Sequence, residues 1–158
     1  DDSQMCAVMD KMRMYIYRGA EPEEPMTCSA YMCVFKDLEV KAVKLTDLME
    51  NPDEPEDGYF FKNDVKSLRD TRNLISNVGL KDGAQFIEEN PHPRLWQLLA
   101  EGALLKMDFS TAESAFVRCK DYQGIQFVKS ILDINNETVK KAEVQAYFKI
   151  TKKWIEFI

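Results

Sequence analysis

The sequence predicts a mixed fold with strands first and helices after: a four-stranded antiparallel blade followed by tetratricopeptide-like (TPR-like) hairpins of an α-solenoid. Before residue 45, apolar residues occur in short runs separated by turn residues, which is typical of strands. After residue 63 they recur at three- and four-residue spacing, which is typical of helices. An acidic segment with two prolines lies between. We therefore expect strands at 1–45, a linker at 46–62 and TPR-like helical repeats at 63–158.

The first part of the chain predicts four strands arranged as two hairpins. The strand-like runs, each bounded by turn residues, are 5–9, 12–17, 29–35 and 39–45. The short turn Asp10-Lys11 joins the first pair, and Lys36–Leu38 joins the second. Four strands in up-and-down order form one blade of a β-propeller. A single blade exposes two faces and two edges, so we expect it to need neighbours for stability.

The segment 46–62 is predicted to be a linker. Thr46 is placed to cap one helical turn, and Pro52 and Pro55 then prevent the helix from continuing. The aromatic run Tyr59–Phe61 is expected to anchor the linker onto one of its two neighbours.

The helices that follow are predicted from cap residues and apolar spacing. Asp64 is expected to cap a helix that buries Val65, Leu68, Ile75 and Val78 and ends at Gly79. The N-caps expected for four later helices are Asp82, Ser110 (with Glu113 completing a capping box), Asp121 and Asn136. Pro93 suits the first turn of a helix that runs to about Lys106.

The central pattern lies between residues 90 and 128 and predicts two antiparallel helices. The residues that match tetratricopeptide spacing are Trp96, Leu99, Ala112 and Phe116, and Gly124 stands where that pattern has a proline. Ala103 lies on the same helical stripe as Trp96 and Leu99. We expect these five apolar residues to pack between helices and not to form a binding site. An ordinary helical hairpin is the alternative. Two short segments recur 30 residues later, and this 30-residue echo favours irregular repeats: Ala112-Glu113 recurs as Ala142-Glu143, and 125–128 as 155–158.

Composition excludes several classes of function. The net charge of −6 argues against a nucleic-acid scaffold, which usually has a basic face. Four cysteines without paired spacing and a single histidine predict no metal site, and no phosphate-binding loop is present. No apolar run approaches the roughly 18 residues of a transmembrane helix. His92 lies between two prolines at a helix start, where a capping or packing role is favoured over catalysis. We therefore expect no enzyme activity, no catalytic residue and no cofactor.

Five segments together resemble a known family. These are RMYIYRGAEPEEP, FKDLEVKAV, VKSLRDTRNLI, NPHPRLWxLLAE and TAExAFVRCKDYQGIxFVK. In this order they resemble the WD-repeat subunits of intraflagellar transport complex A, from the N-terminal strands to about Phe148. The last ten residues do not resemble the family. The resemblance implies the end of the second of two WD-type β-propellers joined to the start of helical repeats.

The same resemblance implies a scaffold role in retrograde ciliary transport and in ciliary entry of membrane proteins. Expected partners are the other subunits of the complex and its cargo adaptors, with no nucleic acid and only indirect membrane association. The expected location is the cilium, its base and the cytoplasm. From the residues at its two ends, we expect the sequence to be a segment of a longer protein.

Two alternatives remain open. The pattern WQLLAE…DFSTAESAF…DYQGI also resembles the α and β′ subunits of the coatomer vesicle coat. The other alternative is a free-standing peptide-binding TPR-like module. That module would need a row of basic residues, whereas Arg94, Lys106 and Arg118 are scattered along the sequence. Such a module also contains no strands, so it does not account for the first part of the chain.

Overall fold

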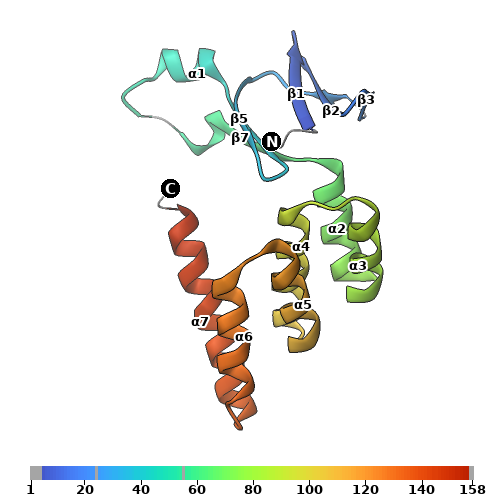
Figure 1. The fold of residues 1–158 in the computed structure, drawn as a ribbon. Helices are drawn as coiled ribbons and strands as arrows, with labels where there is room; N and C mark the ends of the chain where they lie inside the picture. The colour runs from blue at the N-terminus through green and yellow to red at the C-terminus, as the bar shows by residue number, and fades with distance from the viewer. Residues whose placement is uncertain (1–4, 24, 55, 157–158) are drawn as a thin grey trace. The chain divides into compact units, whose positions relative to one another are not determined.

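The computed structural model describes residues 5–23, 25–54 and 56–156, with strands first and helices after (Figure 1). The chain divides into two compact units, residues 1–70 and 71–158. This order and the antiparallel sheets confirm the predicted fold class of propeller strands followed by a helical region. In the described part of the chain, no helix is both long and apolar enough to cross a lipid bilayer.

The strands form two antiparallel sheets. The first contains β1 (Met5–Asp10), β2 (Arg13–Arg18), β3 (Glu21–Pro22) and β4 (Met26–Thr27), and the second contains β5 (Tyr31–Lys36), β6 (Glu39–Val43) and β7 (Phe60–Asp64). The buried side chains alternate along the central strands, with Met14 and Ile16 on β2 and Val40 and Ala42 on β6. This period of two gives each central strand one core face.

The four predicted strands therefore do not share one sheet. β3 and β4 both pair with β2, on the edge that faces away from β1. Two further backbone bonds hold this segment there: the Glu23 N–H donates to the Ile16 carbonyl at 2.7 Å, and the Cys28 N–H donates to the Met12 carbonyl at 2.9 Å. β5 pairs with β6, as predicted for the second hairpin, but it does not join the first sheet because this edge of β2 is already paired.

Residues 60–62 were expected to be linker and are instead part of strand β7. Phe61 lies opposite Ala42 and Phe60 opposite Val43. The aromatic run therefore does anchor the segment, and it does so by pairing with β6. The helical turn in this region is α1 (Leu45–Glu50), so Thr46 lies inside the helix and does not cap it.

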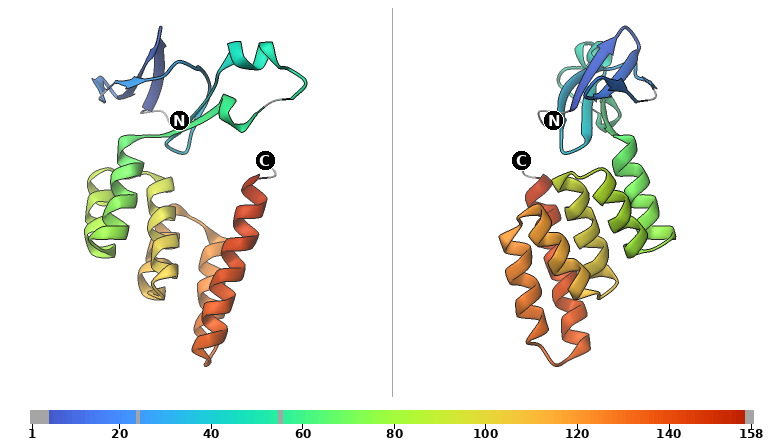
Figure 2. Two further views of the ribbon diagram at one scale, coloured as in Figure 1. Left: turned by 180° about the vertical axis from the view of Figure 1, so that it is seen from behind. Right: turned by 45° about the vertical axis from the view of Figure 1, so that its right-hand side comes forward.

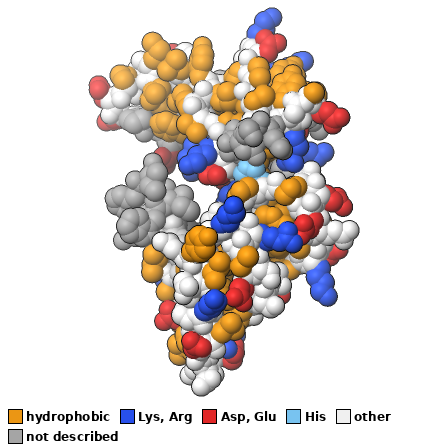
Figure 3. Space-filling view, viewed as in Figure 1, with side chains coloured by type: hydrophobic (Ala, Val, Ile, Leu, Met, Phe, Trp, Pro, Cys, Tyr) orange, Lys and Arg blue, Asp and Glu red, His pale blue; other side chains and the backbone are white. Residues whose placement is uncertain are grey.

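Apolar side chains remain exposed on this sheet unit. Val8, Met12, Tyr31, Val34 and Phe60 are each about half exposed, and Figure 3 shows apolar side chains gathered over the strand part of the molecule. Complete propellers protect such surfaces and edges with neighbouring blades. These exposed apolar side chains are expected of propeller strands that have no neighbouring blade beside them.

Six helices follow in the described region: α2 (Lys66–Asn77), α3 (Leu80–Glu89), α4 (Pro93–Leu105), α5 (Phe109–Cys119), α6 (Tyr122–Leu132) and α7 (Glu137–Glu156). Figure 2 shows α4 and α5, and then α6 and α7, as antiparallel neighbours. One detail of α2 was predicted wrongly: Val78 lies beyond the helix with its side chain 63% exposed. Asp64 is the last residue of β7, two residues before α2 begins.

Side-chain caps begin four of these helices, α4, α5, α6 and α7. The Asp121 carboxylate accepts the Gly124 N–H at 3.0 Å, and the Asn136 amide oxygen accepts the Thr138 N–H at 2.9 Å, which confirms both predicted caps. The expected cap Ser110 is wrong, because Asp108 takes that position. Asp82 is also not a cap, since α3 begins at Leu80 and places Asp82 in its first turn.

Asp108 provides a testable cap. Its carboxylate accepts hydrogen bonds from the Thr111 hydroxyl at 2.6 Å and the Thr111 N–H at 3.1 Å, and these two bonds hold the pKa of Asp108 below its usual range. Asp108→Ala is therefore expected to lower the free energy of unfolding by about 1 kcal/mol, the usual cost of losing an N-cap. Chemical denaturation at pH 7 measures this loss.

The lowered pKa also gives the cap a pH dependence. The folded state favours the ionised carboxylate, so its contribution is present above the unfolded pKa of about 3.9 and is lost as pH falls through the lower folded value. Asp108→Asn keeps an acceptor oxygen but cannot titrate. An identical loss of stability with falling pH in the wild type and Asp108→Asn would contradict this assignment.

The core of the helical unit, residues 71–158, contains the five apolar residues that were predicted to pack between helices. Leu99, Ala103, Ala112 and Phe116 are at most 1% exposed, and Trp96 is 8% exposed. The expectation that these residues pack between helices is confirmed. Small residues in α4 and α5 let the two helices approach closely, and α4 and α5 form the most extensive helix–helix contact in the described chain.

The 30-residue echo does not correspond to equivalent packing. Ala112 is fully buried in α5, whereas its counterpart Ala142 is exposed on α7. Part of the second echo, at 157–158, lies outside the described residues.

Candidate interaction groove

His92, which the sequence analysis weighed as a catalytic residue, has a structural role. His92 is 6% exposed, and its Nδ1 accepts the Arg94 N–H at 3.1 Å at the start of α4. This confirms the expected capping role. The four cysteines are not joined in disulfides, and no cluster of three His, Cys, Asp or Glu residues suited to a metal ion occurs in the described part of the chain.

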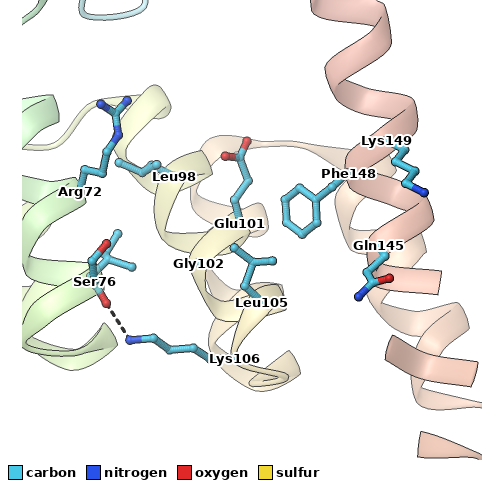
Figure 4. A pocket seen from close by; sticks show the side chains of 11 residues that line it. Arg72, Ser76, Leu98, Glu101, Gly102, Leu105, Lys106, Gln145, Phe148 and Lys149 are labelled. Atoms are coloured by element: carbon cyan, nitrogen blue, oxygen red, sulfur yellow. Dashed lines mark hydrogen bonds between the residues drawn. The ribbon is translucent and has the colours of Figure 1, made fainter. Parts of the chain in front are cut away.

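The helical unit contains an open groove of about 540 Å³ (Figure 4). Its lining comes from α2, α4 and α7: Arg72, Ile75, Ser76, Leu98, Glu101, Gly102, Leu105, Lys106, Gln145, Phe148 and Lys149. Protein segments bind in such concave apolar surfaces when a few polar groups at the rim fix their orientation. This groove is the candidate functional site of the chain.

The floor of the groove depends on two glycines. A Cβ atom on Gly102 of α4 would lie 2.6 Å from Ile75 Cγ2, and one on Gly83 of α3 would lie 2.9 Å from Ile75 Cγ1. Both distances are too short for real side chains. Glycine at these two positions therefore allows the buried Ile75 side chain of α2 to pack directly against α3 and α4.

The walls of the groove are apolar. Leu98 and Leu105 lie four residues before and three residues after Gly102, so all three share one face of α4. Figure 4 shows Phe148 pointing from α7 toward this face. Leu105 keeps 66% of its surface exposed. Sequence reasoning missed this second stripe because it considered only the stripe of α4 that packs against α5.

The position of Phe148 is fixed by its neighbour on α7. Tyr147 stacks on Phe127 of α6 with ring centroids 4.2 Å apart, and the Phe148 ring packs edge-on against Tyr147 at 5.8 Å. Burial raises the pKa of Tyr147 to about 12, and the nearby carboxylates of Asp121 and Glu101 add to the shift. The hydroxyl therefore stays neutral at physiological pH, and the aromatic cluster joins α7 to α6.

The rim of the groove carries more positive than negative charge. Its cations are Arg72, Lys106 and Lys149, and its one carboxylate is Glu101. The Lys106 ammonium donates to the Ile75 carbonyl at 2.7 Å, near the carboxyl end of α2, where a cation is favourable. Arg94 lies 3.7 Å from Glu101 and offsets part of its charge.

A second charged contact lies near the buried Trp96 and does not form a pocket. The Arg118 guanidinium lies 5.1 Å from the centre of the Trp96 ring and 2.8 Å from the Glu88 carboxylate. This arrangement links α3, α4 and α5. Of the scattered cations Arg94, Lys106 and Arg118, only Lys106 lines the groove.

Comparisons with known proteins find similarity over both the strands and the helices. Residues 1–63 match the family model described as WDR35 second beta-propeller. The chain is 53% identical over 148 residues to proteins named WD repeat-containing protein 35 from Rattus norvegicus, Mus musculus and Homo sapiens. The match covers 94% of this chain and 12–13% of those proteins, so the chain corresponds to a small part of each relative.

Proposed function

We propose, from this similarity to WD repeat-containing protein 35, that the chain is a non-enzymatic scaffold segment of an intraflagellar transport complex A subunit. In this role it supports retrograde ciliary transport and the ciliary entry of membrane proteins. The observation that carries the proposal is the 53% identity over 148 residues, a length that includes both strands and helices.

The architecture supports a scaffold role. Helical repeats bind through extended surfaces, so shape and exposed side chains replace a reactive group. The proposed partners are the other subunits of the complex and its cargo adaptors, and nucleic acid is not among them. Contact with membranes is indirect, through the complex. The proposed location is the cilium, its base and the cytoplasm.

The test is the location of the full-length protein that contains this chain. With a fluorescent tag in ciliated cells, we expect signal at the ciliary base and in particles that move along the axoneme. Purification of the tagged protein is expected to recover the other subunits of the complex. The tag alone is the control. Signal confined to membranes near the Golgi would contradict the proposal and favour a coatomer-type coat subunit.

A further inference from the structure

We propose that the groove between α2, α4 and α7 binds an acidic amphipathic segment of a partner protein, with one large apolar side chain of that segment seated against Leu105 and Phe148. The inference deepens the proposed scaffold function, and it rests on that function in taking the partner to be a protein. Three features of the groove carry it.

The first feature is where the apolar residues gather. A single exposed leucine is ordinary on a protein surface. Here Leu98, Leu105 and Phe148 come from two helices and converge on one hollow whose floor is Ile75. The opposite stripe of α4 is already buried in the helix core. The groove therefore offers apolar surface that the packing of the described helices leaves accessible.

The second feature is the shape and polarity of the hollow. A volume of about 540 Å³ is enough for one or two large side chains, and the groove opens between helices as amphipathic segments require. Small-molecule sites usually have polar groups placed deep inside to fix the ligand. The three cations of this groove, Arg72, Lys106 and Lys149, lie instead around its apolar residues, with Glu101 between Leu98 and Phe148, which suits a longer chain that crosses it.

The third feature is charge. Three cations and one carboxylate line the groove, and Arg94 offsets part of the charge of Glu101. The Lys106 ammonium donates to a neutral carbonyl oxygen, so this contact brings no carboxylate beside it. Complementary charge favours the correct partner and speeds its association. Carboxylates beside the apolar anchor of the partner match this rim, and lysines in the same places would be repelled.

The test uses the full-length protein and a phage-displayed library of random 12-residue peptides. Peptides are selected on the wild type and counter-selected on Leu105→Glu, which places a carboxylate at the groove. We expect the enriched peptides to share a large apolar residue and a net negative charge. Enrichment of basic or neutral peptides, or no enrichment that depends on Leu105, would overturn the proposal.

Selected peptides are then synthesised with fluorescein, and Kd is measured by fluorescence anisotropy. We expect Leu105→Glu to raise Kd at least tenfold and Lys149→Glu to raise it several-fold. The matched controls Leu132→Glu and Lys129→Glu change exposed residues of α6 outside the groove and are expected to leave Kd unchanged. Because Lys149 is exposed, its substitution tests the groove even if Leu105→Glu perturbs folding. Equal Kd in the groove variants and their controls would refute the proposal.

Two further results distinguish a partner segment from a second copy of this chain, and the ciliary function from binding in the groove. If light scattering shows that Leu105→Glu converts a wild-type dimer to a monomer, a second copy occupies the groove and the proposal is overturned. Peptide binding that depends on the groove, together with Golgi localisation, refutes the ciliary function but supports the binding site in the groove. Ciliary localisation without groove-dependent binding refutes the groove alone.

Discussion

Phe116→Ala is expected to lower the free energy of unfolding of the helical unit by about 3–5 kcal/mol, the usual cost of removing a large aromatic side chain from a packed core. Phe116 is 1% exposed and lies on α5, the helix that contacts both α4 and α6. Removal of its ring would leave a cavity between these helices. Chemical denaturation followed by tryptophan fluorescence measures the loss.

The matched control is Val117→Ala. Val117 is the next residue of the same helix, and its side chain is 56% exposed. We expect this substitution to change the free energy of unfolding by no more than about 0.5 kcal/mol, as for most surface changes. Similar losses for the two variants would show that Phe116 does not hold the helices together.

Gly124→Ala is expected to destabilise the helical unit by about 1–3 kcal/mol through overpacking. Alanine ordinarily stabilises a helix by about 1 kcal/mol relative to glycine, so the expected sign is the reverse of the propensity. The reason is steric: a Cβ atom on Gly124 would lie 2.4–2.7 Å from three carbons of the Phe116 ring. That ring is buried and cannot move aside without disturbing α4 and α6.

Gly58→Ala is the matched control for this substitution. No atom lies within 4 Å of the Cβ position at Gly58, so we expect no comparable loss of stability. A double-mutant cycle of Gly124→Ala with Phe116→Leu tests the cause directly, since a smaller side chain at 116 should relieve part of the clash. Strictly additive effects of the two substitutions would argue against a clash with the ring.

The tetratricopeptide pattern has a proline at the position of Gly124, and the structure explains the difference. Gly124 is the third residue of α6, and its N–H donates to the Asp121 carboxylate at 3.0 Å. A proline has no N–H and would lose this cap. Gly124 therefore serves both the start of α6 and its close approach to α5.

Sequence reasoning found the helices and their core because both depend on local information. Apolar spacing identified the stripe of Trp96 and Leu99, and side-chain caps at Asp121 and Asn136 act within three residues of their own position. The choice of Asp108 over Ser110 was missed. Both residue types are good caps, and only the backbone conformation selects between them.

The groove was not predicted for a different reason. Its walls come from α4 and α7, and its floor comes from Ile75 of α2. No local pattern connects residues 75, 105 and 148. Leu98 and Leu105 were visible in the sequence as apolar residues, but their accessibility depends on how the neighbouring helices pack.

The sequence by itself determined the order of strands and helices, the buried stripe and the similarity to WD repeat-containing protein 35, because periodicity, caps and motifs are properties of neighbouring residues. The tertiary structure alone decided that the strands form two sheets and that a cationic-rimmed groove lies beside α4. Strand partners and grooves depend on backbone hydrogen bonds and packing between distant segments. In this chain strands β3 and β4 pair with the free edge of β2, and two glycines set how closely Ile75 approaches its neighbours.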